Sequence, residues 1–180
     1  MPGIIIYGSQ YGTAKQYAEE LARRTGLETR PFDAAGDMGG YGTIAYIGGL
    51  YAGGVMGMKR TFAKLGGCEG KTIVIATVGL ADPEDPENVA NIERSMTKQL
   101  PAEVLGCARI FHLRGGIDYA KLGFKHKTMM RLLYSKAKSL PEEEKTAEVR
   151  AMIETYGKQV SFVDFDSLEP IVAALQAAGE

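Results

Sequence analysis

The chain has little of what a metalloprotein or a nucleic-acid-binding protein needs. Its 180 residues include two cysteines, two histidines and no tryptophan, and the formal charge at pH 7 is −1. Cys68 and Cys107 are neither closely spaced nor accompanied by a ligand set, so we expect free thiols and no metal site. The near balance of acidic and basic residues predicts no general attraction to nucleic acid.

Long hydrophobic runs are also missing. No window approaches the apolar length of a membrane-spanning helix, and the N-terminus lacks a basic segment followed by an apolar one. We therefore expect a cytoplasmic protein. Its composition, 45% hydrophobic and 24% charged, is typical of a folded chain, and its length predicts a single domain over residues 1–180.

The first two dozen residues carry the clearest functional signal. An apolar strand, Ile4–Tyr7, leads through the loop Gly8–Thr13 directly into an amphipathic helical pattern. The loop amides and the unsatisfied N–H groups at the start of a helix form a binding site for a phosphate. The alternative is an ordinary turn in which Gly12 relieves a tight backbone.

The same loop excludes three common phosphate-binding classes. It has no lysine, so it is not the loop of a nucleoside triphosphatase, and it lacks the glycine pattern of dinucleotide-binding proteins. It also lacks the clustered acidic residues with which a phosphorylatable receiver domain holds magnesium. A phosphate here would be held mainly by neutral hydrogen bonds.

Strand and helix signals alternate along the chain. Apolar runs predict strands over residues 4–7, 27–32, 43–47, 72–78 and 108–113. Helical patterns lie between them: one ends at Gly26, one begins at Asp85 and Pro86 with an inward face of Val89, Ile92, Met96 and Leu100, and a last one is capped by Ser167. This order predicts a three-layer α/β domain with a parallel sheet, in which ligands bind beyond the carboxyl ends of the strands.

Two further loops follow predicted strand ends. Gly48–Gly57 is rich in glycine and contains Tyr51, which can stack on a flat ring, whereas Thr77–Pro83 offers mainly backbone donors and acceptors. With the first loop, they suit a phosphorylated, planar, neutral ring system. The alternative for the glycine-rich loop is a mobile surface segment.

The chain resembles the flavodoxin-like family, in particular the branch that includes the quinone-linked protoporphyrinogen dehydrogenases of bacteria. The resemblance is carried by Ser9-x-x-Gly12-Thr13, by Gly49–Tyr51, by Val78–Leu80 and by the block Phe111–Tyr119. It departs from the usual pattern at Ala14, where the family has a second hydroxyl residue.

The resemblance implies a five-stranded parallel sheet in the order 2-1-3-4-5, with helices on both faces, and a noncovalently bound FMN. Its phosphate would be held by the first loop, the ring would stack on Tyr51, and the third loop would contact the polar edge of the ring. The implied cofactor-binding residues are Ser9, Gln10, Tyr11, Gly12, Thr13, Ala14, Leu50, Tyr51, Ala52, Gly53, Val78, Gly79 and Leu80.

A basic segment precedes the last helix. Between Tyr119 and Leu140 there are six basic residues and no acidic one, interleaved with apolar residues that include two methionines. Such a surface suits anionic lipid at the inner face of the membrane or an acidic partner protein. The alternative is a core-packing helix with solvated lysines. We expect the whole segment, at about residues 117–160, to be an insertion into the domain.

These observations favour an FMN-dependent oxidoreductase that oxidises a reduced substrate, such as protoporphyrinogen, with a quinone as acceptor. A flavodoxin-type electron carrier, and a scaffold that no longer binds flavin, are the alternatives. No nucleophile and base are paired as hydrolysis requires. His112 is either a proton relay or a strand histidine satisfied by a neighbouring backbone group. No catalytic side chain is assigned, since the flavin itself would carry the redox chemistry.

Overall fold

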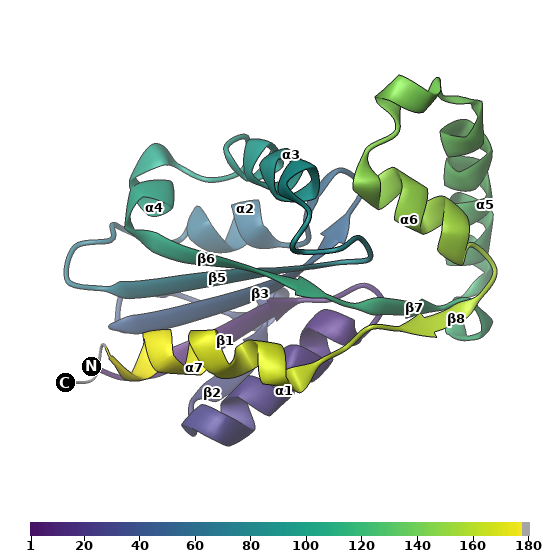
Figure 1. Cartoon of the computed structure of the whole chain (residues 1–180). Helices are drawn as coiled ribbons and strands as arrows, with labels where there is room; N and C mark the ends of the chain where they lie inside the picture. Colours follow the sequence, from purple (N-terminus) through teal and green to yellow (C-terminus); the bar gives the residue numbers. More distant parts are fainter. Residues whose placement is uncertain (178–180) are drawn as a thin grey trace.

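A parallel sheet runs through the centre of the computed structural model, which describes residues 1–177 (Figure 1). The parallel strands lie in the order β2-β1-β3-β5-β6, which confirms the predicted order 2-1-3-4-5. Their bounds are β1 Gly3–Gly8, β2 Glu28–Pro31, β3 Thr43–Tyr51, β5 Thr72–Gly79 and β6 Ala108–Arg114. A short β4 (Gly54–Val55) pairs antiparallel with the end of β3.

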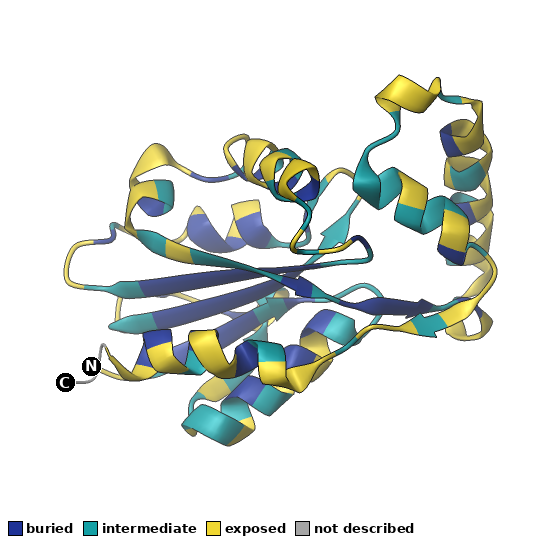
Figure 2. Cartoon of the chain, in the orientation of Figure 1, coloured by how far each residue is buried: buried dark blue, intermediate teal, exposed yellow. Residues whose placement is uncertain are grey.

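The central strands are apolar on both faces. Ile4, Ile5 and Ile6 of β1 are fully buried, although successive side chains of a strand point to opposite faces of the sheet. The two faces accordingly form two separate hydrophobic clusters, one containing Ile4 and Ile6 and the other Ile5. Burial on both sides is typical of a parallel sheet covered by helices, and Figure 2 shows these strands as the buried centre of the chain.

Helices cover both faces, as predicted for a three-layer domain (Figure 1). One face carries α2 (Met58–Phe62), α3 (Pro86–Met96) and α4 (Ala102–Cys107), with the 3-10 turn η1 (Phe32–Ala34) nearby. The other face carries α1 (Thr13–Thr25) and α7 (Glu169–Gln176).

The ends of α1 follow the expected signals. Gly12 precedes the helix with φ 91°, and Gly26 ends it with φ 73° and an N–H that donates to Ala22 O (2.8 Å). Both backbone conformations favour glycine, because other L-residues rarely adopt positive φ. The helix is therefore held between two glycines, and its N-terminus faces the end of β1.

Helix α3 begins as predicted, but its inward face differs at two positions, because Val89 is not buried and Leu100, although buried, lies beyond the end of the helix at Met96. The Asp85 side chain accepts from the N–H of Glu87 (2.9 Å), with Pro86 in the first turn. Ile92 and Met96 are buried, whereas Val89 is only half-buried. Asn88 takes the buried position because its side-chain amide donates to Asp82 O (2.8 Å).

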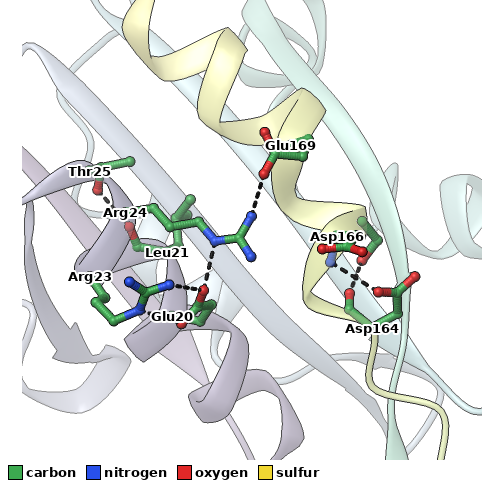
Figure 3. Close-up of polar contacts among 9 residues, drawn as sticks. Glu20, Leu21, Arg23, Arg24, Thr25, Asp164, Asp166 and Glu169 are labelled. Atoms are coloured by element: carbon green, nitrogen blue, oxygen red, sulfur yellow. Dashed lines mark hydrogen bonds and ion pairs between the residues drawn. The ribbon is translucent and has the colours of Figure 1, made fainter.

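The prediction that Ser167 caps the last helix is wrong. The chain first forms a 3-10 turn, η4 (Phe165–Leu168), and α7 begins only at Glu169. Asp164 caps this turn by accepting from the N–H of Asp166 (3.0 Å), and the Ser167 hydroxyl donates to the Asp164 carbonyl (Figure 3). The capping side chain is therefore the carboxylate of Asp164, which caps the 3-10 turn, whereas no side chain caps α7 itself.

Helices α1 and α7 are linked by ion pairs on their outer surface (Figure 3). Arg24 donates to Glu20 (2.7 Å) on its own helix and to Glu169 (2.6 Å) on α7. Hydrogen bonds from Arg23 and Arg24 lower the pKa of Glu20 to about 2. Because solvent screens such pairs, we assign the attachment of α7 mainly to its buried residues Ile171 and Leu175 and to Leu168 just before the helix.

A segment of helices and short strands separates β6 from η4, and we call residues 116–161 the arm. Its two ends pair as an antiparallel ribbon, β7 (Gly116–Asp118) with β8 (Gln159–Ser161). Between them lie η2 (Tyr119–Lys121), α5 (Phe124–Ser139), η3 (Glu142–Glu144) and α6 (Ala147–Thr155). The arm has a small core of its own around Ile117, Tyr119 and Met130.

We expect Tyr17→Phe to lower the free energy of unfolding by about 1–3 kcal/mol. Tyr17 is fully buried, and its hydroxyl donates to Arg114 O (2.7 Å) and accepts from Asp164 N (2.9 Å). Removal of the hydroxyl leaves both backbone groups without this partner. Urea unfolding measures the effect, with Tyr41→Phe at a half-buried tyrosine as control; equal stabilities of the two variants would contradict it.

Candidate functional site

The carboxyl ends of four parallel strands meet around one small cavity. Its volume is about 40 Å³, and its walls come from the ends of β3 and β5, the loops after β1, β5 and β6, the start of α1, and α6. Most of the predicted cofactor-binding residues lie in these walls, namely Ser9, Gln10, Tyr11, Thr13, Ala14, Leu50, Val78, Gly79 and Leu80. These residues lie close together because the strands are parallel, which places their C-terminal ends and the loops that follow at the same edge of the sheet.

The first loop is built around the N-terminus of α1. The Gly12 N–H donates to Ser9 Oγ (3.0 Å), which holds the loop in a tight turn beneath the helix. Thr13 opens the helix, where the first N–H groups have no partner within the helix. Ala14 is 1% exposed and packs in the core, so its side chain contributes packing and only its backbone N–H can serve as a donor.

The second loop does not present Tyr51 as an open stacking surface. The Tyr51 ring lies edge-on to Tyr11 (centroids 6.3 Å apart), and its hydroxyl donates to Met129 Sδ (3.4 Å) on α5. Burial of the Tyr11 hydroxyl is the main cause that raises its pKa to about 12, and the neighbouring Tyr51 adds to the effect. Ala52 and Gly53 form the exposed turn of the β3–β4 hairpin, outside the cavity walls.

The third loop has its backbone donors occupied. The N–H groups of Leu80 and Ala81 each donate to the Glu148 carboxylate of α6 at 3.0 Å. The Leu80 carbonyl accepts from Arg114 Nε (2.9 Å) at the end of β6. The loop is therefore fixed from both sides, by an arginine of the sheet and by a carboxylate of the arm.

Several cavity residues were missed at the level of sequence. Gly115 and Gly116 follow β6, and Gly115 donates to Gly79 O (2.7 Å), so the loop after the fifth parallel strand contributes to the site. The strand order predicts that this loop lies near the site, but it does not identify Gly115 and Gly116 as the residues that line it. The contact of Glu148 with this site could not be predicted from the sequence. Glu148 lies on an amphipathic helix, and its neighbours in the sequence do not indicate a contact with a loop 68 residues upstream.

His112 lies outside the cavity walls and is satisfied within the sheet. Its Nδ1 is 2.7 Å from Thr77 Oγ1 on the neighbouring strand, and burial lowers its pKa. His112 is thus held within the sheet and not in the cavity, but its partner is a side-chain hydroxyl and not the predicted backbone group.

Neither a cluster of metal ligands nor a membrane-spanning helix is found among the described residues. Within residues 1–177, no three or more His, Cys, Asp or Glu side chains are grouped so that they could hold a metal ion. None of the helices in the same part of the chain is long and apolar enough to cross a membrane.

Comparison with known proteins points to one family. A family model described as a flavodoxin domain matches residues 4–144. Oxidised flavodoxin 1 from Bacillus cereus is similar at 15% identity, with 63% of this chain and 84% of that chain covered and a TM-score of 0.42. A flavodoxin mutant from Pseudomonas aeruginosa is similar at 17% identity, with 78% and 99% covered and a TM-score of 0.40.

A search of curated proteins finds no match. The family model spans well over half of the chain, and it covers the strands and loops that surround the cavity. The chain belongs to the flavodoxin family.

Proposed function

We propose that this protein is an FMN-binding oxidoreductase whose cofactor lies at the carboxyl ends of the parallel strands. The observation that carries the proposal is the single cavity in which three predicted flavin loops meet over the N-terminus of α1. Family membership supports the same cofactor class.

The phosphate end of the site suits FMN. The N-terminus of a 13-residue helix lies beside the hydroxyl of Thr13, and the loop Ser9–Thr13 contains no charged side chain. Backbone N–H groups, a hydroxyl and the helix dipole can hold a phosphate monoester without a lysine. This end would discriminate FMN from a flavin that lacks the phosphate.

The ring end has suitable donors, but α6 covers them. Leu80 and Ala81 present adjacent backbone N–H groups, which suit the carbonyl oxygens and ring nitrogens of a flavin edge. Bound FMN would supply the electron-transfer chemistry, while the chain positions the ring and excludes water. In the structure these two N–H groups are bonded to Glu148.

The finer proposal is that the protein oxidises protoporphyrinogen and passes the electrons to a quinone. The block Phe111–Tyr119, which carries that resemblance, forms β6 and β7 and leads directly into the arm. The arm reaches the cavity through α6, so substrate access and the arm are coupled. The second candidate is an electron carrier without its own substrate, favoured by the position of His112 outside the cavity walls.

FMN binding tests the cofactor proposal. We expect the wild type to bind FMN at least about tenfold more tightly than riboflavin, because only FMN engages the helix N-terminus. Thr13→Val should weaken FMN binding by about three- to tenfold and leave riboflavin unchanged. Quenching of flavin fluorescence measures both, with Thr97→Val as a control at the C-cap of α3, where the hydroxyl donates to Arg94 O. Equal affinity of the wild type for the two flavins would exclude a phosphate site.

Turnover separates the two functional candidates. An FMN-loaded sample is expected to oxidise protoporphyrinogen repeatedly with menadione as acceptor, measured by the fluorescence of the porphyrin product. A sample that carries FMN and accepts electrons from a chemical reductant, yet shows no turnover, would be an electron carrier.

We also propose that the outer face of α5 contacts anionic lipid. Phe124 is 86% exposed and Leu132 is 67% exposed, and the basic residues Lys125, Lys127 and Arg131 on the same helix are exposed. Apolar side chains among cations suit an interface of acyl chains and anionic headgroups. Met130 and Ala137 are buried on the opposite side, so α5 has both a packed and a free face.

Vesicle binding tests this contact. The triple variant Lys125→Glu, Lys127→Glu and Arg131→Glu is expected to lose co-sedimentation with phosphatidylserine vesicles, because the charge reversal replaces attraction with repulsion. The control Lys59→Glu, Arg60→Glu and Lys64→Glu makes the same change in net charge at exposed residues in and just after α2. Equal binding of both triple variants would refute a specific role of α5.

A further inference from the structure

We infer that the arm is an internal lid on the cofactor site and that the Glu148 carboxylate competes with the flavin ring for the N–H groups of Leu80 and Ala81. The inference rests on the proposed function, because it concerns the regulation of that same site. It assigns to Glu148 a role that flavin binding alone does not require.

The bonding of Glu148 is the first observation. One carboxylate oxygen lies 3.0 Å from Leu80 N, and the other lies 3.0 Å from Ala81 N and 3.2 Å from Leu80 N. Hydrogen bonds to an ionised acceptor are stronger than bonds between neutral groups. The carboxylate therefore saturates both adjacent donors of the loop.

The polar partners of the Glu148 carboxylate are these backbone N–H groups. Arg150, a basic residue on the same helix, turns to Glu142 instead (3.3 Å). Thr146 caps α6 by accepting from Val149 N (3.3 Å), which places Glu148 in the first helical turn facing the loop. The helix therefore presents an anion to the loop, as a bound ligand would.

Space at the site is the second observation. The cavity of about 40 Å³ is far smaller than the roughly 300–1,000 Å³ of small-molecule sites. A Cβ atom added to Gly79 would lie 3.0 Å from Glu148 Oε2 and 2.7 Å from Leu50 Cδ1. The carboxylate thus lies directly against the backbone that a flavin edge would approach, and ring and carboxylate exclude one another.

The arm also contacts the other two loops. Gln10 Nε2 and His126 Nε2 lie 2.6 Å apart, and Tyr11 donates to Met130 Sδ (3.3 Å). Tyr51 donates to Met129 Sδ (3.4 Å). Bonds to thioether sulfur are weak, and methionine adapts readily to new neighbours. Tyr11 and Leu80 also pack against the cluster around Ile117, Tyr119 and Met130, so polar and apolar contacts together hold the arm over the site.

The covalent attachment of the arm permits release. It joins the rest of the chain only through β7 and β8, which pair with each other, and α5 and α6 share the small core around Met130. The stacked rings of Tyr134 and Tyr156 (centroids 3.9 Å apart) tie α5 to the end of α6. Withdrawal of α6 would free the loop amides while the central sheet stays intact.

FMN affinity tests the competition. Glu148→Ala is expected to lower the Kd for FMN at least about tenfold relative to the wild type, since FMN no longer has to displace the carboxylate. Glu148→Gln, which keeps the shape but not the charge, should have an intermediate effect. Glu154→Ala is the matched control, because it removes an exposed carboxylate from the same helix.

A second measurement reports the contact without any flavin. In FMN-free protein, the amide resonances of Leu80 and Ala81 should shift in Glu148→Ala, and their hydrogen exchange should accelerate about tenfold or more. The same amides should be unchanged in Glu154→Ala. Circular dichroism confirms that each variant is folded.

The outcomes distinguish the lid from the proposed function. If the wild type and Glu148→Ala bind FMN equally well, the competition is refuted and FMN binding stands. If neither binds FMN although the Leu80 and Ala81 amides are released, the FMN proposal fails and the competition fails with it. Unchanged amides in Glu148→Ala would show that the carboxylate does not hold the loop.

Discussion

The alignment of the parallel strands is the constraint on which the rest of the structure depends. Gly8 of β1 pairs in register with Gly48 of β3, Gly48 with Thr77 of β5, and Thr77 with His112 of β6. Parallel register brings the C-terminal end of each strand to the same edge, so loops that are distant in sequence must meet there. The cavity, the position of the α1 N-terminus beside it and the contacts of the arm all follow from this edge.

Close packing at this edge restricts the residues that can occupy it. A Cβ atom on Gly8 would lie 2.8 Å from the Tyr46 hydroxyl and would collide with the Met56 carbonyl. That hydroxyl donates to Met56 O, which draws the loop after β4 over the end of β1. Because Gly8 has no side chain, the loop after β4 can pack closely against the end of β1.

The fold could be predicted from the sequence because its signals are local. Continuous apolar runs identify the parallel strands, and Gly26 and Asp85 mark helix ends by short-range chemistry. Ser167 misled because two capping residues lie close together, and Asp164 starts a 3-10 turn before α7. When two possible capping residues lie within a few residues of each other, the sequence alone does not show which of them caps, because tertiary packing decides where the helix begins.

The candidate site could be predicted only in part. The loops were found because strand order determines where they meet, and residues such as Ser9 and Leu80 lie in the cavity walls. The sequence places an aromatic residue at Tyr51, but it does not reveal that Tyr11 and Met129 contact it. Glu148 was out of reach for the same reason, because its role depends on how an inserted helix folds back onto the sheet.

The ribbon at the base of the arm has a consequence for how this domain can change. Gly115 bonds to Gly79 O on one side, and Phe162 donates to Gly115 O (2.9 Å), so the chain leaves and re-enters the sheet edge at one place. Gly116 and Ser161 face each other as paired residues, a separation of roughly 5 Å between Cα atoms. A connection of a few residues could span that distance. The length of the arm is thus independent of the spacing at its base, because its two ends leave and re-enter the sheet edge side by side.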